Sequence, residues 1–219
     1  MKTRAVVSFL ALVAATHAAT PGAILWRVDD PKRVGEQATT VLGAPRVLQE
    51  EGRKALRFNG ASDGLIVPQV PIQGWRAFTI EVLFKPAADG PEAQRFVHLE
   101  DKAENRALIE TRVTPAGQWY LDTFLFSKPR EHGVTLVDKA KLHPCDHWYW
   151  AALVYDGKVM SHFVNGAKEK EGALEFGPML EGRTSLGVRL NQVFWFKGAI
   201  AEVRFHPRAL TGAELQQPK

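Results

Sequence analysis

Two polar segments in the middle of the chain carry side chains that could contact or cleave a sugar. The segment ALIETRV places Glu110 and Arg112 two residues apart, and the segment WYLDTFLF adds Tyr120 and Asp122 with the same spacing. Residues two apart on a β-strand point to the same side of a sheet. Carboxylates and guanidinium groups hydrogen-bond to sugar hydroxyls, and an aromatic ring stacks on a pyranose face. The pattern therefore predicts a sheet face that binds carbohydrate.

Three further side chains occupy alternating positions in neighbouring segments, and we expect them on the same concave face. The segment FTIEVLFKP has an apolar side and leaves Glu81 on the other side, while two later segments contribute a tyrosine and a histidine. The predicted ligand-binding residues of the concave face are Glu81, Glu110, Arg112, Tyr120, Asp122, Tyr149 and His162.

This set of residues supports three different roles, and the sequence alone leaves them open. Sugar binding needs no perturbed pKa. Catalysis could use two carboxylates in glycoside hydrolysis, or a tyrosine, histidine and arginine in polysaccharide elimination. A polar sheet face can also simply face solvent, with Glu110 and Arg112 forming ion pairs with a neighbour such as Asp122. No residue is assigned a catalytic role at this stage.

Short alternating strands are the elements expected to position these residues. His147–Asp156 (HWYWAALVYD) alternates with a period of two, and hairpin signals follow at Asp156-Gly157 and Asn165-Gly166. No long amphipathic helix interrupts such segments, and 219 residues with 45% apolar side chains can bury one large core. The pattern predicts an all-β sandwich or barrel.

The two ends of the predicted domain carry further signals. Ile24–Trp26 is expected to be an edge strand that packs against the C-terminal strand, and Val193–Phe196 is expected to be another strand. Thr211 and Glu214 have the spacing of a capping box, in which a hydroxyl and a carboxylate each bond to a backbone N–H. A short helical turn is therefore predicted at the C-terminus.

Together these segments resemble the laminin-G-like jelly rolls of the concanavalin A-like lectin and glucanase superfamily, close to its pentraxin-type branch. The resemblance rests on Ala55–Pro68, Phe78–Pro86, the hairpins from Trp148 to Gly166, and Phe196–Leu215. It implies an all-β, two-sheet antiparallel jelly-roll β-sandwich as one domain over residues 20–219. The superfamily contains sugar-binding modules, adhesion domains, glycoside hydrolases and polysaccharide lyases, so the site must be argued separately.

The resemblance implies a secreted glycan-binding, lectin-like domain that uses its concave face. A polysaccharide-degrading enzyme on the same face, either a glycoside hydrolase or a lyase, is one alternative, and a protein-binding adhesion or scaffold module is another. The hydrolase branch carries acidic residues two apart on one strand, and this chain departs from that pattern because Leu83 stands two residues after Glu81.

Many members of this superfamily carry a calcium ion at the edge of the sandwich, so the resemblance also implies a structural Ca²⁺. The matching ligands here are Asn59, Asp63 and Glu202, whose side chains offer the oxygen atoms that Ca²⁺ prefers. The family often has Asp immediately before that glutamate, where this chain has Ala201.

The N-terminus reads as a secretory signal peptide over residues 1–19. Lys2 and Arg4 precede an apolar run from Ala5 to Ala15, and small residues follow it. The run is too short to span a bilayer, so no membrane span is expected. The prediction is a secreted or periplasmic protein.

Charge and cysteine content narrow the class of protein further. Removal of Lys2 and Arg4 with the signal peptide lowers the formal net charge from +4 to +2, and no basic cluster indicates nucleic acid as a partner. The single cysteine, Cys145, excludes an intramolecular disulfide, and its setting favours a buried thiol over a nucleophile.

Overall fold

The computed structural model describes residues 22–218, and it is built almost entirely from antiparallel strands. One sheet, called the front sheet here, contains β1 (Ile24–Arg27), β5 (Arg46–Glu50), β6 (Arg53–Asn59), β8 (Phe78–Pro86), β14 (Tyr149–Tyr155), β15 (Val159–Val164), β16 (Ala167–Ala173) and β18 (Lys197–His206). The back sheet contains β4 (Thr40–Leu42), β7 (Gly64–Val67), β9 (Ala93–Asp101), β10 (Arg106–Val113), β11 (Gln118–Ser127), β12 (His132–Val137), β13 (His143–Pro144) and β17 (Gly182–Leu186). A separate hairpin joins β2 (Arg33–Val34) to β3 (Gln37–Ala38).

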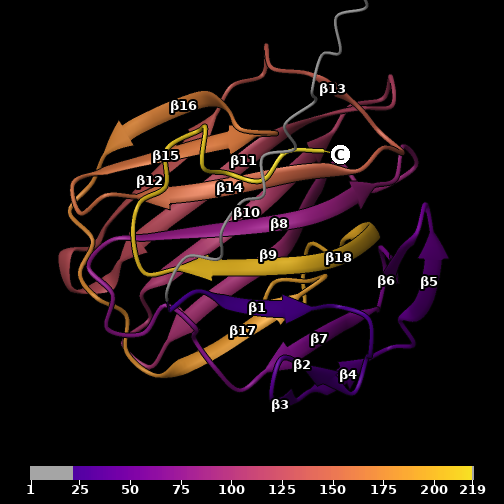
Figure 1. The fold of residues 1–219 in the computed structure, drawn as a ribbon, viewed down its shortest axis with the longest axis horizontal. Helices are drawn as coiled ribbons and strands as arrows, with labels where there is room; N and C mark the ends of the chain where they lie inside the picture. Colours follow the sequence, from indigo (N-terminus) through magenta and orange to yellow (C-terminus); the bar gives the residue numbers. More distant parts are fainter. Residues whose placement is uncertain (1–21, 219) are drawn as a thin grey trace, which may run out of the picture.

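Strand order in both sheets mixes segments that are distant in sequence. The front sheet runs β16-β15-β14-β8-β18-β6-β5 with β1 beside β18, and the back sheet runs β12-β11-β10-β9-β17-β7-β4 with β13 beside β11. Figure 1 shows the front sheet lying over the fainter strands of the back sheet. The predicted two-sheet antiparallel jelly-roll sandwich is confirmed, as is the pairing of the N-terminal strand with the C-terminal one.

The core lies between the two sheets because each strand turns its apolar side inward. In β8 the residues Phe78, Ile80, Val82 and Phe84 are all buried in it. Phe84 stacks on Phe96 of β9, with ring centroids 4.4 Å apart, which joins the sheets. Burying one such side chain contributes about 2–3 kcal/mol, so these contacts hold the strands of the site rigidly in place.

The C-terminal segment after β18 covers part of the outer face of the front sheet. Figure 1 shows it crossing in front of β14 (yellow). Leu210 and Leu215 pack there with Val154 and Phe163 in a second apolar cluster. Its main-chain N–H at Leu210 donates to the hydroxyl of Thr79, 2.9 Å away. The outer face of β14 and β15 is therefore buried here as well.

The predicted C-terminal turn is present, but it makes one turn and no regular helix. The backbone N–H groups of Glu214 and Leu215 both donate to the carbonyl of Thr211. The Glu214 carboxylate accepts from the Thr211 N–H at 2.9 Å, which is one half of the predicted capping box. The other half differs from a capping box, in which the hydroxyl accepts from a backbone N–H. Here the Thr211 hydroxyl donates to the Glu214 carboxylate.

Three other expectations are placed as follows. Val193–Phe196 is a loop and not a strand, because its backbone turns sharply, with Phe194 in the left-handed region at φ 59°. The predicted signal peptide, residues 1–19, lies outside the described residues. Within residues 22–218, no helix is long and apolar enough to cross a membrane.

Candidate functional site

The outer face of the back sheet brings together four of the seven residues predicted for the binding face. Strand pairing places Glu110 of β10 opposite Asp122 of β11, and Arg112 opposite Tyr120. On the other side of β10, Glu110 also lies opposite Arg95 of β9. Residues opposite one another on adjacent strands have their side chains on the same face, so all five share it.

A β-bulge brings Arg95 onto this face. The pairing of β9 with β10 shifts between Ile109 and Glu110, so that one extra residue of β9 is accommodated there. Phe96 and Val97 both lie in the core as a result, and the side chain of Arg95 emerges outside beside Glu110. Bulges re-aim side chains in this way and are common next to functional sites.

Arg95, Glu110, Arg112 and Asp122 form a compact ion-pair network, which we call the arginine–carboxylate cluster. Arg112 donates from Nε and Nη2 to Asp122 Oδ2, at 2.8 and 2.7 Å. The Glu110 Oε2 atom lies 3.1 Å from Arg95 Nε and 3.6 Å from Arg112 Nη2. The carboxylate side chains are only 5% and 2% exposed, so both charges are held in place by guanidinium groups.

The cluster is incompletely paired and opens on a cavity of about 270 Å³. Asp122 Oδ1, Arg95 Nη1 and Arg106 Nε are buried and have no hydrogen-bond partner among the described residues. A buried polar atom without a partner is costly, and such atoms mark places where water, an ion or a ligand binds. The cavity is also lined by Arg106, Leu108, Phe124, Thr135 and Arg189.

Burial controls the charge of this site. It raises the pKa of Glu110 to about 7, with the neighbouring Asp122 charge adding to the effect and Arg95 and Arg112 opposing it. Burial also raises the pKa of Asp122, against the opposing hydrogen bond from Arg112. Four arginines therefore line the cavity against two carboxylates, one of which is partly protonated at neutral pH.

Phe124 lines the cavity, and two more aromatic rings lie on the same face of the sheet. Phe124 and Phe126 of β11 are nearly parallel with ring centroids 6.0 Å apart, and the Arg106 guanidinium lies 4.4 Å from the centroid of Phe126. Tyr120 lies on the same side of β11, next to Arg112. Rings fixed beside charged groups provide flat surfaces on which a sugar ring stacks.

The loop between β17 and β18 forms one wall. The guanidinium of Arg95 lies 3.6 Å from the centroid of the Phe194 ring, and the Arg95 N–H donates to the Phe194 carbonyl. The Leu190 N–H donates to Nδ1 of His98, 3.0 Å away, which ties the loop to β9. Arg189 of this loop reaches the cavity.

Sequence reasoning missed Arg95, Arg106, Arg189 and Phe194. Arg106 follows the same alternation as Leu108 and Glu110, and that signal could have found it. The bulge displaces Arg95, and Arg189 and Phe194 lie in a loop. No periodic pattern therefore indicated these three residues.

The prediction that Glu81 lies on this face is wrong. It lies on the outer side of the front sheet, where the C-terminal segment covers it, and it is 1% exposed. Its Oε2 atom lies 2.9 Å from Nε2 of His206, and its Oε1 accepts from the N–H of Gln216 at 2.7 Å. Glu81 therefore anchors the C-terminus.

Tyr149 and His162 were also predicted on the binding face, and both point into the core instead. The Tyr149 hydroxyl donates to the carbonyl of Pro144 at 2.8 Å, and its ring packs edge-on against Trp119. Nδ1 of His162 lies 3.1 Å from the Thr123 hydroxyl, between the two sheets. Tyr149 of β14 and His162 of β15 lie on the side of the front sheet that faces the back sheet.

Buried His162 makes the fold sensitive to acid. Burial, helped by the charge of Lys170, lowers its pKa to about 4, so the unfolded chain binds a proton at higher pH than the folded one. The stabilisation is complete above the ordinary pKa of about 6.5 and is lost as pH falls towards 4. Between pH 7 and pH 5 we expect the free energy of unfolding of His162→Gln to fall by about 2 kcal/mol less than that of the wild type. Urea titrations at each pH measure the difference. His132→Gln, at an exposed position, is the control, and equal slopes for the two variants would contradict the expectation.

The residues predicted to bind calcium do not come together. The side-chain oxygen of Asn59 accepts from the N–H groups of Ala61, Ser62 and Asp63, and the Asp63 carboxylate accepts from Ala44 and Asn59. In the strand register Asn59 lies opposite Lys197, and Glu202 stands five residues further along β18. Glu202 forms an ion pair with Arg204. Five strand residues span about 16 Å, so Glu202 is too far to complete this set. Residues 22–218 contain no group of three or more His, Cys, Asp or Glu side chains arranged to hold a metal ion.

The thiol of Cys145 is buried, as the sequence predicted. Burial, together with the charge of Asp146, raises its pKa to about 11. A thiol of that pKa is almost wholly protonated at neutral pH, and it is therefore a poor nucleophile.

These features define a jelly-roll sandwich with a polar, arginine-rich site on one outer sheet face. The chain belongs to the concanavalin A-like lectin/glucanases superfamily: the Laminin_G_3 family pattern matches residues 59–216. A sequence search of curated proteins found no match.

Solved structures share the fold at low sequence identity. Domain 4 of AbnA, a GH43 extracellular arabinanase from Geobacillus stearothermophilus in complex with arabinotriose, has a TM-score of 0.64 and 19% identity, with 87% of this chain and 94% of that one covered. The binding domain of Paraclostridial Mosquitocidal Protein 1 has a TM-score of 0.66 and 12% identity, covering 89% and 51%. The botulinum neurotoxin serotype D ligand-binding domain in complex with N-acetylneuraminic acid has a TM-score of 0.64 and 10% identity, covering 88% and 49%. The chain thus spans about half of those two toxin structures.

Proposed function

We propose that this protein is an exported glycan-binding module that binds its ligand at the arginine–carboxylate cluster. The observation that carries the proposal is a buried ion-pair network whose residues line a cavity and which contains donors and an acceptor without a hydrogen-bond partner among the described residues. A sugar supplies hydroxyl groups that both donate and accept, so it matches free atoms of both kinds. The arabinotriose and N-acetylneuraminic acid complexes of structurally similar domains support the same class of ligand.

In this proposal each group has a defined role. Asp122 accepts a hydrogen bond from one sugar hydroxyl, while Arg95 and Arg106 donate to others, since all three residues line the cavity. Tyr120 stacks on the sugar at the edge of the cavity. The signal peptide directs the protein to the periplasm or the exterior, where glycans are accessible. A structural Ca²⁺ is a separate proposal, supported by the superfamily and not by the arrangement of Asn59, Asp63 and Glu202.

A second candidate function is cleavage of the bound glycan. The observation that favours it is the raised pKa of Glu110, about 7, because a carboxylic acid that stays protonated near neutral pH can act as a general acid. Asp122 is the adjacent carboxylate that a hydrolytic mechanism would require.

Incubation of residues 20–219 with neutral and acidic polysaccharides, in calcium or in chelator, tests these functions together. Retention without release of reducing or unsaturated ends is expected for a binding module. Release of such ends would establish an enzyme, and a requirement for calcium would support the ion. Failure to retain any polysaccharide would contradict glycan binding and favour a protein-binding module.

Tyr120 provides a direct test of stacking. We expect Tyr120→Ala to raise the dissociation constant for the retained glycan roughly fivefold, because a stacked ring contributes about 1 kcal/mol. Tyr120→Phe keeps the ring and serves as the matched control, which should bind within twofold of the wild type. Equal affinity of the alanine variant and the wild type, measured by calorimetry, would remove Tyr120 from the site.

A further inference from the structure

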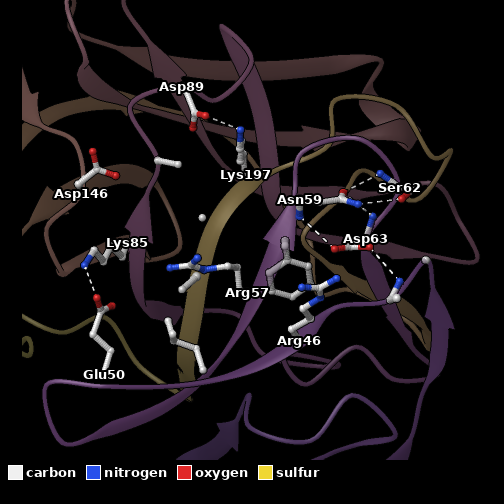
Figure 2. A pocket seen from close by; sticks show the side chains of 17 residues that line it. Arg46, Glu50, Arg57, Asn59, Ser62, Asp63, Lys85, Asp89, Asp146 and Lys197 are labelled. Carbon is white, nitrogen blue, oxygen red and sulfur yellow. Dashed lines mark hydrogen bonds and ion pairs between the residues drawn. The ribbon is translucent and has the colours of Figure 1, made fainter.

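A second cavity of this protein lies on the front sheet, away from the arginine–carboxylate cluster. It has a volume of about 770 Å³ and lies over the outer faces of β5, β6 and β18, closed by the loops that carry Gly43, Asp89 and Asp146. Figure 2 shows charged side chains pointing into it from several of these elements. The volume suits a ligand of one to a few sugar units.

Two unpaired guanidinium groups stand in this cavity. Arg46 of β5 and Arg57 of β6 lie directly opposite one another in the strand register. Figure 2 shows Arg57 extending into the open middle of the cavity and Arg46 bordering it near Asp63, with no hydrogen bond or ion pair joining either to another residue drawn. Like charges directly opposite on neighbouring strands are destabilising, and an anion between them would remove that cost.

The other basic groups of the cavity are already neutralised. Lys85 Nζ lies 3.0 Å from Glu50 Oε1, and Lys197 Nζ lies 2.6 Å from Asp89 Oδ2; Figure 2 shows the first ion pair to the left of Arg57 and the second above it. The guanidinium groups left without an ion-pair partner are therefore those of the two arginines, although the Asp63 and Asp146 carboxylates also line the cavity.

The cavity also holds an acceptor for hydroxyl groups. The exposed Asp146 carboxylate has only a 3.4 Å contact from the Ala88 N–H among the described residues. Sulfate offers no O–H to such an acceptor and inorganic phosphate few, whereas a sugar acid offers several beside its carboxylate. Leu48 and Ala199 form an apolar floor that fits the C–H face of a sugar ring.

We propose that this cavity is a second binding site, specific for a uronic acid, with the uronate carboxylate held by Arg46 and Arg57. A hydroxyl of the same sugar donates to the Asp146 carboxylate. The site is independent of the one on the back sheet, so its ligand is either a free uronic acid or a uronate unit within a polysaccharide chain.

Equilibrium binding of D-glucuronate, D-glucose and a short oligogalacturonide to the mature protein tests this proposal. We expect D-glucuronate to bind at least tenfold more tightly than D-glucose, and Arg57→Gln and Arg46→Gln each to weaken that binding about tenfold. Arg27→Gln, which removes the same charge at an exposed position of β1, should change it less than twofold. Tight binding of the oligomer alone, lost in the double variant, would support the polysaccharide source.

Two further measurements show whether a loss of binding comes from this cavity, from misfolding or from the back-sheet site. Removal of either arginine relieves the repulsion, so the melting temperature of the free variant should equal or exceed that of the wild type. Arg112→Gln should leave D-glucuronate binding unchanged. Wild-type affinity in the Arg46→Gln, Arg57→Gln double variant, equal binding of glucose and glucuronate, or loss of glucuronate binding in Arg112→Gln would each overturn the proposal.

Discussion

Replacement of Arg112 by glutamine is expected to raise the dissociation constant for the glycan bound at the back sheet roughly 30-fold. Arg112 holds Asp122 through two short hydrogen bonds and also neutralises Glu110, so its loss misplaces the acceptor carboxylate and removes a donor. Hydrogen bonds to charged groups contribute about 1.5–3 kcal/mol, and 2 kcal/mol corresponds to about 30-fold in affinity. Calorimetric titration with a glycan that the wild type retains provides the measurement.

Two variants make this result interpretable. Asp122→Asn preserves the shape of the side chain and removes its charge, and it should weaken binding by a similar factor if the ion pair is required. Arg130→Gln is the matched control, because Arg130 pairs with Glu175 at a solvent-exposed position. Folding of each variant is checked by circular dichroism. Wild-type affinity in both Arg112→Gln and Asp122→Asn would mean that the cluster is only a solvated ion-pair network.

Replacement of Glu81 by alanine is expected to lower the free energy of unfolding by about 3 kcal/mol, with no change in glycan affinity. The substitution leaves the His206 ring and the Gln216 N–H without their partner under the C-terminal segment. Removal of one partner of a buried, charged hydrogen bond costs about 3–5 kcal/mol, and water entry at the chain end reduces that figure. Urea denaturation measures the change.

The exposed Glu175 supplies the comparison for this stability effect. Glu175→Ala removes a carboxylate whose side chain is 84% exposed, and it should cost less than about 0.5 kcal/mol. Faster hydrogen exchange of the Gln216 amide in Glu81→Ala would locate the damage at the C-terminal segment. If Glu81→Ala were as stable as the wild type and yet lost glycan binding, Glu81 would belong to a binding site and not to the anchor.

Part of the candidate site could be predicted from alternation alone. Glu110 and Arg112 are two apart on β10, Tyr120 and Asp122 are two apart on β11, and the two strands are consecutive. Consecutive strands joined by a short turn pair in register, so side chains on matching sides meet. Local sequence therefore carries enough information for this pair of strands.

The predictions for Glu81, Tyr149 and His162 were wrong because the side that each residue faces depends on contacts beyond its own strand. Glu81 does face outward, but β8 belongs to the front sheet, and period-two alternation does not say which sheet a strand joins. The strand with Tyr149 is apolar on both sides, because the C-terminal segment covers its outer face, so its inner side could not be identified. The side chain of His162 is polar yet lies in the core, where Nδ1 has Thr123 of the opposite sheet as its partner and Nε2 has none among the described residues.

By itself the sequence determined the class of fold and the shared face of Glu110, Arg112, Tyr120 and Asp122. These follow from side-chain periodicity and turn residues, which act over a few neighbouring positions. Only the tertiary structure decided that Arg95 and Arg189 complete the site, and that two arginines stand unpaired in a cavity on the other sheet. Bulges, long loops and the order of strands in a sheet depend on contacts between distant parts of the chain, and no local pattern encodes those contacts.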